Sequence, residues 1–168
     1  GREHAFAWKL AQSPRIGKLF IAPGNGGTRQ IAENVPIDTN DITALVQFAE
    51  KNDIDLTVIG PDDSLALGIV NAFQARGLRV FGPTKAAAEI ESSKAFAKRL
   101  MQEAGVPTAS FRTFHNYDNA LAYIREQDAP IVVKASGLAL GKGAYVCKTL
   151  TKAERALEKI MLDRVHND

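Results

Sequence analysis

The chain alternates short apolar runs with segments in which apolar residues recur every three or four positions. The apolar runs cover residues 19–22, 55–60 and 79–82, and the helical periodicity covers about 41–51 and 64–76. Short continuous apolar strands that alternate with helices are typical of a parallel sheet covered on both faces. We therefore predict an α/β fold with a doubly wound parallel sheet in the first half of the chain.

Polar residues mark the predicted helix starts. Asn40 or Asp41 precedes the first of these helices, Ser64 lies near the start of the second, and Thr84 precedes a third. Side-chain oxygens of such residues cap free backbone N–H groups. The chain itself opens on Gly1 and a helical pattern, and a glycine before a helix commonly closes a strand-to-helix turn. We therefore expect the first strand of the sheet to precede Gly1.

The pattern changes in the second half of the chain. A continuous helix is predicted over about 85–104, and Gly105-Val106-Pro107 stops it. Beyond this stop the sequence predicts a strand at 109–114, a helix at 117–127, strands at 131–135 and 144–148, and a closing helix. Two strands joined directly by a glycine-rich turn favour an antiparallel hairpin. We predict one domain over 1–90 and a second over 91–168, with a small α+β subdomain from about residue 108.

Composition narrows the class of protein. Of the 168 residues 45% are hydrophobic and 24% charged, which is the balance of an ordinary packed domain. Cys147 is the single cysteine, so the chain cannot build a disulfide framework, and a reducing, cytoplasmic location is expected. The net charge of +2 is spread along the chain, which disfavours a nucleic-acid partner. With no apolar run of about 20 residues, no membrane span is predicted.

A glycine-rich turn between the two hairpin strands is the strongest candidate for chemistry. It reads Lys134-Ala135-Ser136-Gly137-Leu138-Ala139-Leu140-Gly141-Lys142-Gly143. Glycines let backbone N–H groups approach an anion, and lysines add positive charge for phosphate oxygens. The turn is not a Walker A loop, because three residues separate Gly137 from Gly141 and no hydroxyl follows Lys142. An ordinary hairpin is the alternative, although Lys134 ends an apolar strand, where its charge must reach solvent or an anion.

Three further turns follow the predicted parallel strands: Pro23-Gly24-Asn25-Gly26-Gly27-Thr28, Gly60-Pro61-Asp62-Asp63-Ser64 and Gly82-Pro83-Thr84. Ligands of open parallel sheets bind at this edge, and exposed backbone N–H groups suit a phosphorylated small molecule. The first turn lacks the third glycine of the dinucleotide fingerprint, which disfavours a nicotinamide cofactor. The alternative is that these prolines and glycines only form turns and bind no ligand. The three histidines have no metal-ligand spacing, so no metal site is predicted.

Six motifs occur in a fixed order: Gly1-Arg2-Glu3-His4-Ala5, Pro23-Gly24-Asn25, Gly60-Pro61, Phe81-Gly82-Pro83-Thr84, Ser93-Lys94-Ala95-Phe96-Ala97-Lys98 and Lys134-Ala135-Ser136-Gly137-Leu138-Ala139. Together they resemble the glycinamide ribonucleotide synthetase family of ATP-grasp ligases over essentially the whole chain. The resemblance implies a Rossmann-like pre-ATP-grasp domain followed by the start of an α+β ATP-grasp domain. It also implies an enzyme of purine synthesis that joins 5-phosphoribosylamine to glycine, splits ATP to ADP and phosphate, and passes through glycyl phosphate.

The resemblance assigns roles to individual residues. The ATP-binding set that it implies is Lys94, Lys134, Ser136, Gly137, Gly141, Lys142 and Gly143. The set that it implies for phosphoribosylamine is Gly1, Arg2, Glu3, Gly24, Asn25, Gly60, Pro61, Asp62, Gly82, Pro83 and Thr84. No catalytic residue is identified, and the ligands of the Mg²⁺ or Mn²⁺ that accompanies ATP are expected downstream of residue 168. Residues 1–168 alone are therefore expected to be inactive.

The resemblance implies small-molecule partners only, namely ATP, glycine and 5-phosphoribosylamine, and we expect a monomer. Two motifs depart from the family. In the glycine-rich turn, the family usually shows alanine where Leu140 stands and valine where Ala144 stands. The family usually shows Gly-Pro-Glu-x-Pro-Leu where this chain has Gly60-Pro61-Asp62-Asp63-Ser64-Leu65, so the carboxylate at Asp62 is one methylene shorter. Two alternatives stay open: another ATP-grasp carboxylate–amine ligase or carboxylase, and a non-catalytic protein that only binds a nucleotide.

Overall fold

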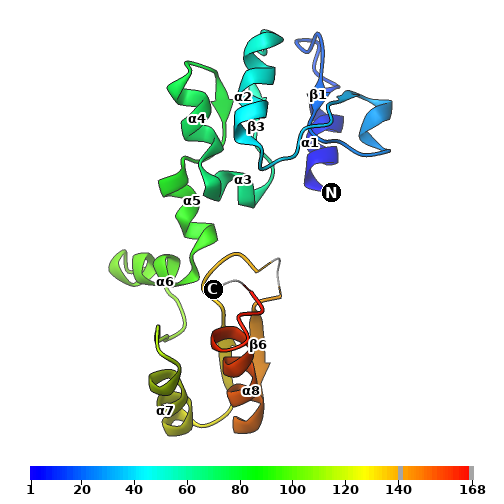
Figure 1. Ribbon diagram of the computed structural model, residues 1–168. Coiled ribbons are helices and arrows are strands. Elements are labelled where there is room, and N and C mark those ends of the chain that lie inside the picture. The colour runs from blue at the N-terminus through cyan, green and yellow to red at the C-terminus, as the bar shows by residue number, and fades with distance from the viewer. Residues whose placement is uncertain (140–141, 167–168) are drawn as a thin grey trace. The chain divides into compact units, whose positions relative to one another are not determined.

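The computed structural model describes residues 1–139 and 142–166. It divides into two compact units, Gly1–Ala88 and Glu89–Asp168. Both units mix helices with short strands, so the α/β content expected from the sequence is confirmed (Figure 1). In the described part of the chain, no helix is long and apolar enough to cross a membrane.

The first unit holds most of the helices and all of the parallel strand pairs. Its elements are α1 (Arg2–Leu10), β1 (Phe20–Ile21), the 3-10 helix η1 (Thr28–Gln30), β2 (Glu33–Asn34), α2 (Ile42–Lys51), β3 (Thr57–Val58), α3 (Asp62–Leu67), α4 (Ile69–Ala75), β4 (Val80–Phe81) and the first half of α5 (Lys85–Ser92). β1 pairs with β2 and β3 pairs with β4, both in parallel. The strands therefore run parallel as predicted, but the described residues form two separate two-stranded sheets and not one continuous sheet.

The core of the first unit is built by two helices. Phe73 and Val70 of α4 are each 1% exposed and pack against Val46 and Ala49 of α2. Phe48, also on α2, makes an edge-to-face contact with Phe20 of β1, with ring centroids 5.3 Å apart. Burial of these apolar side chains provides the main stabilisation of the unit and fixes the helices against the strands.

Two details of the first unit differ from the sequence predictions. The helix predicted over 64–76 is two helices, because Gly68 between them adopts a left-handed conformation with φ of 94°. Ser64 does not cap a helix: α3 already begins at Asp62, and the buried Ser64 hydroxyl donates to the carbonyl oxygen of Thr39 at 2.7 Å. The cap predicted at Asp41 is confirmed, since its side chain accepts from the N–H of Ala44 at 3.0 Å.

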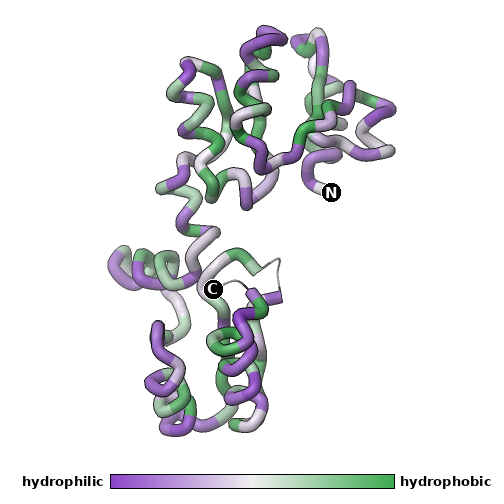
Figure 2. The backbone as a smooth tube through the Cα atoms, in the orientation of Figure 1, coloured by the Kyte–Doolittle hydropathy of each residue, from purple (hydrophilic) through white to green (hydrophobic). Residues whose placement is uncertain are grey.

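The second unit contains α6 (Lys94–Glu103), α7 (Tyr117–Gln127), β5 (Ile131–Lys134), β6 (Ala144–Cys147) and α8 (Leu150–Met161). The strands form the predicted antiparallel hairpin, with Ile131 opposite Cys147 and Lys134 opposite Ala144. α7 and α8 pack together on one face of this hairpin. Hydrophobic and hydrophilic residues alternate along α8, as expected for a helix with one buried face (Figure 2).

Two predictions for this part of the chain were wrong. The continuous helix over 85–104 is interrupted at Ser93, which is extended and caps α6 by accepting from the N–H of Phe96 at 3.2 Å. No strand forms at 109–114 in the described structure. Instead, Lys98 donates to the Thr108 hydroxyl and the Ala109 carbonyl oxygen at 2.6 and 2.7 Å, so this segment is tied to α6 and not to a neighbouring strand.

Candidate functional site

The start of α1 carries three of the residues predicted to bind phosphoribosylamine, and it contacts two of the three predicted turns. The guanidinium of Arg2 pairs with the carboxylate of Asp62 through contacts of 3.2 and 3.3 Å. Glu3 lies against Gly60, where an added Cβ atom would be 3.1 Å from the Glu3 Cγ atom. The structure thus brings Arg2 and Glu3 together with Gly60 and Asp62, although Arg2 and Asp62 are 60 residues apart in sequence.

The first turn is also next to α1. A Cβ atom added at Gly27 would lie 2.6 Å from the Cε1 atom of His4, so this glycine lets the helix approach the turn closely. Gly24 adopts a left-handed conformation with φ of 77° and is covered by the side chain of Asn34. A side chain at either glycine would require a shift of its neighbours. The turn can therefore keep its shape only with glycine at both positions.

Asn25 is exposed, as are Pro23 and Gly26 of the same turn, and the Asn25 side chain holds the backbone of the turn. Its Oδ1 atom accepts from the N–H groups of Gly27 and Thr28 at 2.8 and 3.1 Å. Thr28, which is 0% exposed, and Asn34 hold the Asn25 backbone. The sequence indicates Thr28 only as the last residue of the turn motif and does not indicate Asn34, because nothing local predicts that a residue of β2 folds back onto the turn.

The third predicted turn is packed differently. A Cβ atom added at Gly82 would lie 3.1 Å from the Leu65 and Val70 side chains, so this glycine is held against the apolar interior of its unit. Pro83 follows in an exposed position. The hydroxyl of Thr84 accepts from the N–H of Ala87 at 3.4 Å, at the start of α5. The packing of Gly82 against the apolar interior and the capping of α5 by Thr84 therefore account for the shape of this turn.

In the second unit, two of the predicted ATP-binding segments meet. The Lys94 side-chain amine donates to the Gly137 carbonyl oxygen at 2.8 Å, and the Lys94 backbone N–H donates to the Ser136 carbonyl oxygen, also at 2.8 Å. The Ser136 hydroxyl accepts from the N–H of Ala95 at 3.1 Å. The beginning of the glycine loop is therefore anchored to the first turn of α6.

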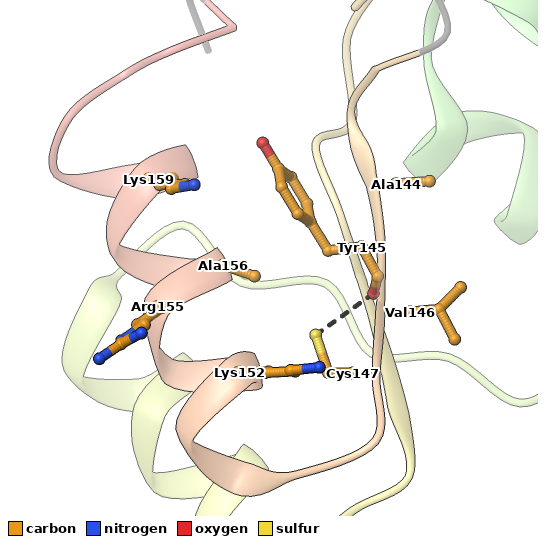
Figure 3. Close-up of a pocket in the computed structure, with 8 residues that line it drawn as sticks. All are labelled: Ala144, Tyr145, Val146, Cys147, Lys152, Arg155, Ala156 and Lys159. Atoms are coloured by element: carbon orange, nitrogen blue, oxygen red, sulfur yellow. Dashed lines mark hydrogen bonds between the residues drawn. The ribbon is translucent and has the colours of Figure 1, made fainter.

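The hairpin has an open face that carries Lys134. Side chains alternate along strands, so Val132 and Lys134 of β5 share a face with Ala144 and Val146 of β6. Figure 3 shows Ala144 and Val146 turned away from α8, whereas Tyr145 and Cys147 point toward it. Val132 is 49% and Val146 72% exposed. The face is thus an exposed apolar surface with a lysine at its end, next to the glycine loop.

The far end of the loop closes back on the hairpin. The Ala135 N–H donates to the carbonyl oxygen of the buried Gly143 at 2.8 Å. A Cβ atom added at Gly143 would lie 2.6 Å from the Ala139 Cβ atom, which leaves no room for a side chain. Lys142 is exposed. The predicted ATP-binding residue Gly141 lies outside the described residues.

A cavity of about 390 Å³ opens on the other side of the hairpin, between β6 and α8 (Figure 3). Lys152, Arg155 and Lys159 line it, and none of the predicted ATP-binding residues does. Tyr117, on α7, has its pKa raised above the usual value by partial burial and then by the carboxylates of Glu158 and Glu154. Neither feature belongs to the predicted site.

The metal that accompanies ATP needs carboxylate oxygens close together. Among residues 1–139 and 142–166, no group of three His, Cys, Asp or Glu side chains is placed to hold a metal ion. A metal site built of three or more of these side chains is therefore absent from the described residues.

Comparison with known proteins matches the chain to one family along its whole length. Residues 1–91 match the model of the phosphoribosylglycinamide synthetase N domain, and residues 92–168 match the ATP-grasp (A) domain of the same family. A phosphoribosylamine–glycine ligase of Pasteurella multocida is 53% identical over 163 residues, which cover 96% of this chain and 38% of the relative. The chain thus spans less than half the length of this relative.

Solved structures give a consistent picture. The crystal structure of a phosphoribosylamine–glycine ligase from Thermotoga maritima is 28% identical, with a TM-score of 0.76, and the match covers 98% of this chain and 38% of that one. The biotin carboxylase domain of a 2-oxoglutarate carboxylase from Hydrogenobacter thermophilus is 19% identical, with a TM-score of 0.72 over 95% of this chain and 39% of that one. At this low identity, the second likeness concerns the fold alone.

Proposed function

We propose a function from the premise that this chain belongs to the phosphoribosylglycinamide synthetase family: the full-length protein joins 5-phosphoribosylamine to glycine and splits ATP to ADP and phosphate. One observation carries this proposal. The two domain models of a single family match the chain in succession, from residue 1 to residue 168. The 2-oxoglutarate carboxylase domain shares the fold with this chain, but at 19% identity this likeness does not favour the alternative carboxylase function.

The second unit is proposed to bind ATP. The open hairpin face offers Val132 and Val146 as an apolar surface for the purine ring, and Lys134 at its end as a cation for a phosphate. Lys94 reaches the same loop, since its amine lies on the Gly137 carbonyl oxygen. We assign the phosphates to these two lysines and to the backbone of the loop, which includes Ser136, Gly137, Gly141, Lys142 and Gly143.

The first unit is proposed to bind 5-phosphoribosylamine. This substrate carries a phosphate, two hydroxyls and an amine, so it needs both donors and acceptors. The edge formed by α1 and the turns at Asn25 and Gly60 supplies both: Arg2 and Asn25 are exposed donors, while Glu3 and Asp62 are acceptors. The remaining residues of this proposed site are Gly1, Gly24, Pro61, Gly82, Pro83 and Thr84.

The chemistry follows from the poor reactivity of a carboxylate. Transfer of the γ-phosphoryl group of ATP to the glycine carboxylate gives an acyl phosphate, and the amine of phosphoribosylamine then attacks the carbonyl carbon and releases phosphate. In such a reaction a protein mainly positions the reactants and balances their negative charge. Lys94 and Lys134 are proposed to balance charge on ATP, and Mg²⁺ or Mn²⁺ would do so through ligands outside the described residues.

We further propose the arrangement in which these sites are built. Residues 1–90 would form a Rossmann-like pre-ATP-grasp domain whose strand pairs belong to one doubly wound sheet. Residues 91–168 would begin the ATP-grasp domain, with the glycine-loop subdomain from about 108. The protein would act as a cytoplasmic monomer.

Glycine-dependent release of ADP tests the function. The purified full-length protein should release ADP only when ATP, glycine and 5-phosphoribosylamine are all present. Release that needs bicarbonate in place of glycine would assign the protein to the carboxylases. Nucleotide binding without any ADP release would support the non-catalytic alternative.

A further inference from the structure

Thr28 and Asn34 form a closed ring of hydrogen bonds with the backbone of Asn25. The Asn25 N–H donates to the Thr28 hydroxyl oxygen at 2.7 Å, and the Nδ2 atom of Asn34 donates to the Asn25 carbonyl oxygen at 2.8 Å. The Thr28 oxygen also lies 2.8 Å from the Asn34 Oδ1 atom and 3.0 Å from the Asn25 carbonyl oxygen. A hydroxyl has one proton, so only one of these two contacts is a hydrogen bond at a time.

The position of that proton follows from the other partners. The Asn25 carbonyl oxygen already accepts from Asn34, whereas the Asn34 Oδ1 atom accepts only from Thr28 among the described hydrogen bonds. The Thr28 hydroxyl therefore donates to Asn34. The ring runs from the Asn25 N–H through Thr28 and Asn34 back to the Asn25 carbonyl oxygen, so both backbone groups of Asn25 are fixed by two side chains.

The ring leaves the outer part of Asn25 available. Its Oδ1 atom is bonded to the Gly27 and Thr28 N–H groups, whereas its Nδ2 donors take part in none of the described hydrogen bonds. Asn25 is exposed, Asn34 is partly buried and Thr28 is 0% exposed. Thr28 thus cannot touch a ligand from its position, yet it fixes the residue that can.

We infer that Thr28 and Asn34 are positioning residues for 5-phosphoribosylamine, acting through Asn25. This inference rests on the proposed function of the first unit. The ring holds the Asn25 backbone, and the bonds to Oδ1 hold its side chain, so that the Nδ2 donors face the substrate in one fixed geometry. A donor held in place before binding loses less conformational freedom when the substrate arrives.

The test uses the full-length protein and two variants at position 28. Thr28→Val keeps the shape but removes the hydroxyl, and it should raise the KM for 5-phosphoribosylamine about three- to tenfold, the effect of one lost hydrogen bond. The KM values for ATP and glycine should stay within about twofold. Thr28→Ser restores the hydroxyl and should restore the KM. Val46→Ala destabilises the core of the same unit without touching the turn and should leave all three KM values unchanged.

A second variant and a second readout keep the test decisive. Asn34→Asp keeps an acceptor for Thr28 but removes the donor to the Asn25 carbonyl oxygen, so it should raise the same KM even if Thr28→Val does not fold. Hydrogen exchange of the Asn25 amide should be about three- to tenfold faster in Thr28→Val than in the unmodified protein. Equal changes in all three KM values, or an unchanged amide, would overturn the positioning role. If the unmodified protein has no ligase activity, faster exchange of the Asn25 amide in Thr28→Val would still show that the ring holds Asn25. Only the assignment of 5-phosphoribosylamine as the ligand would then be wrong.

Discussion

The side-chain amine of Lys94, at the start of α6, donates a hydrogen bond to the Gly137 carbonyl oxygen at 2.8 Å. The backbone N–H of Lys94 bonds to Ser136, the preceding residue of the loop. Lys94 therefore ties two residues of the glycine loop to the start of α6, and the bond from the Ala95 N–H to the Ser136 hydroxyl adds to this anchor. Under the proposed function, a phosphate of ATP would compete with the Gly137 carbonyl oxygen for the Lys94 amine.

Removing the Lys94 amine should loosen the loop. In Lys94→Met, amide exchange over 136–139 should be about three- to tenfold faster without nucleotide, because one hydrogen bond that holds the loop is lost. Lys98→Met is the matched control, since this lysine lies on the same helix but bonds to Thr108 and Ala109. Amide exchange is measured by mass spectrometry on peptides that cover the loop, and the two variants are compared with the unmodified protein. Equal acceleration in both variants would show that the helix is disturbed and not the anchor.

Nucleotide binding should protect the loop. Amides over 136–143 should exchange more slowly when ATP is added to the full-length protein, because phosphates would bond to the backbone N–H groups of a glycine-rich segment. The measurement compares amide exchange over 136–143 with ATP and without it. The same exchange in both conditions would identify the segment as a structural turn.

Lys134 should contribute directly to nucleotide affinity. A charge-assisted hydrogen bond contributes about 1.5–3 kcal/mol, so Lys134→Ala should raise the dissociation constant for ATP about ten- to a hundredfold. Lys159→Ala removes an exposed lysine of the same unit from the opposite side of the hairpin, and its effect should be small. Titration calorimetry on the full-length variants measures both constants. A folded Lys134→Ala protein with the original affinity would exclude the proposed role.

Gly143 should not tolerate a side chain. The added methyl group of Gly143→Ala would meet Ala139 and Ala135, and overpacking of this kind lowers the free energy of unfolding by about 1–3 kcal/mol. Gly17→Ala is the control, because no atom lies within 4 Å of a Cβ atom built there. Urea unfolding followed by circular dichroism compares the two. We also expect weaker ATP binding in Gly143→Ala, since the loop must shift to make room.

The Arg2–Asp62 pair should affect the substrate more than stability. Its side chains are 61% and 40% exposed, and ion pairs this exposed contribute about 0–1 kcal/mol to the free energy of unfolding. Asp62→Asn should therefore unfold almost as the unmodified protein does, but with a raised KM for 5-phosphoribosylamine. Glu50→Gln breaks the comparable exposed pair with Arg76 elsewhere in the unit and should leave that KM unchanged. A KM that rises equally in both variants would contradict a substrate contact at Asp62.

Several local features could be predicted because their causes lie close together in the sequence. The period of apolar residues predicted α2 and α7, and Asp41 and Asn116 cap these helices as short polar residues do. The hairpin followed from two apolar strands around one glycine-rich turn. Breaks inside helical patterns were missed at Gly68 and Ser93, because helical periodicity continues across both residues while their backbones do not. The strand predicted at 109–114 does not form, because its residues have strand character but find no partner strand among the described residues.

The sequence by itself determined the alternation of helices and strands, the sense of the strand pairs and the family, through motifs whose order is a property of the chain. Only the tertiary structure decided which of those motifs meet: Arg2 with Asp62, Lys94 with Gly137, and Thr28 and Asn34 around Asn25. Periodicity and capping depend on neighbours within a few residues, so they can be read locally. The first two contacts join segments that are 60 and 43 residues apart in sequence, so they form only when the chain packs. The third is nearer in sequence, but it depends on the pairing of β2 with β1, which places Asn34 beside the turn.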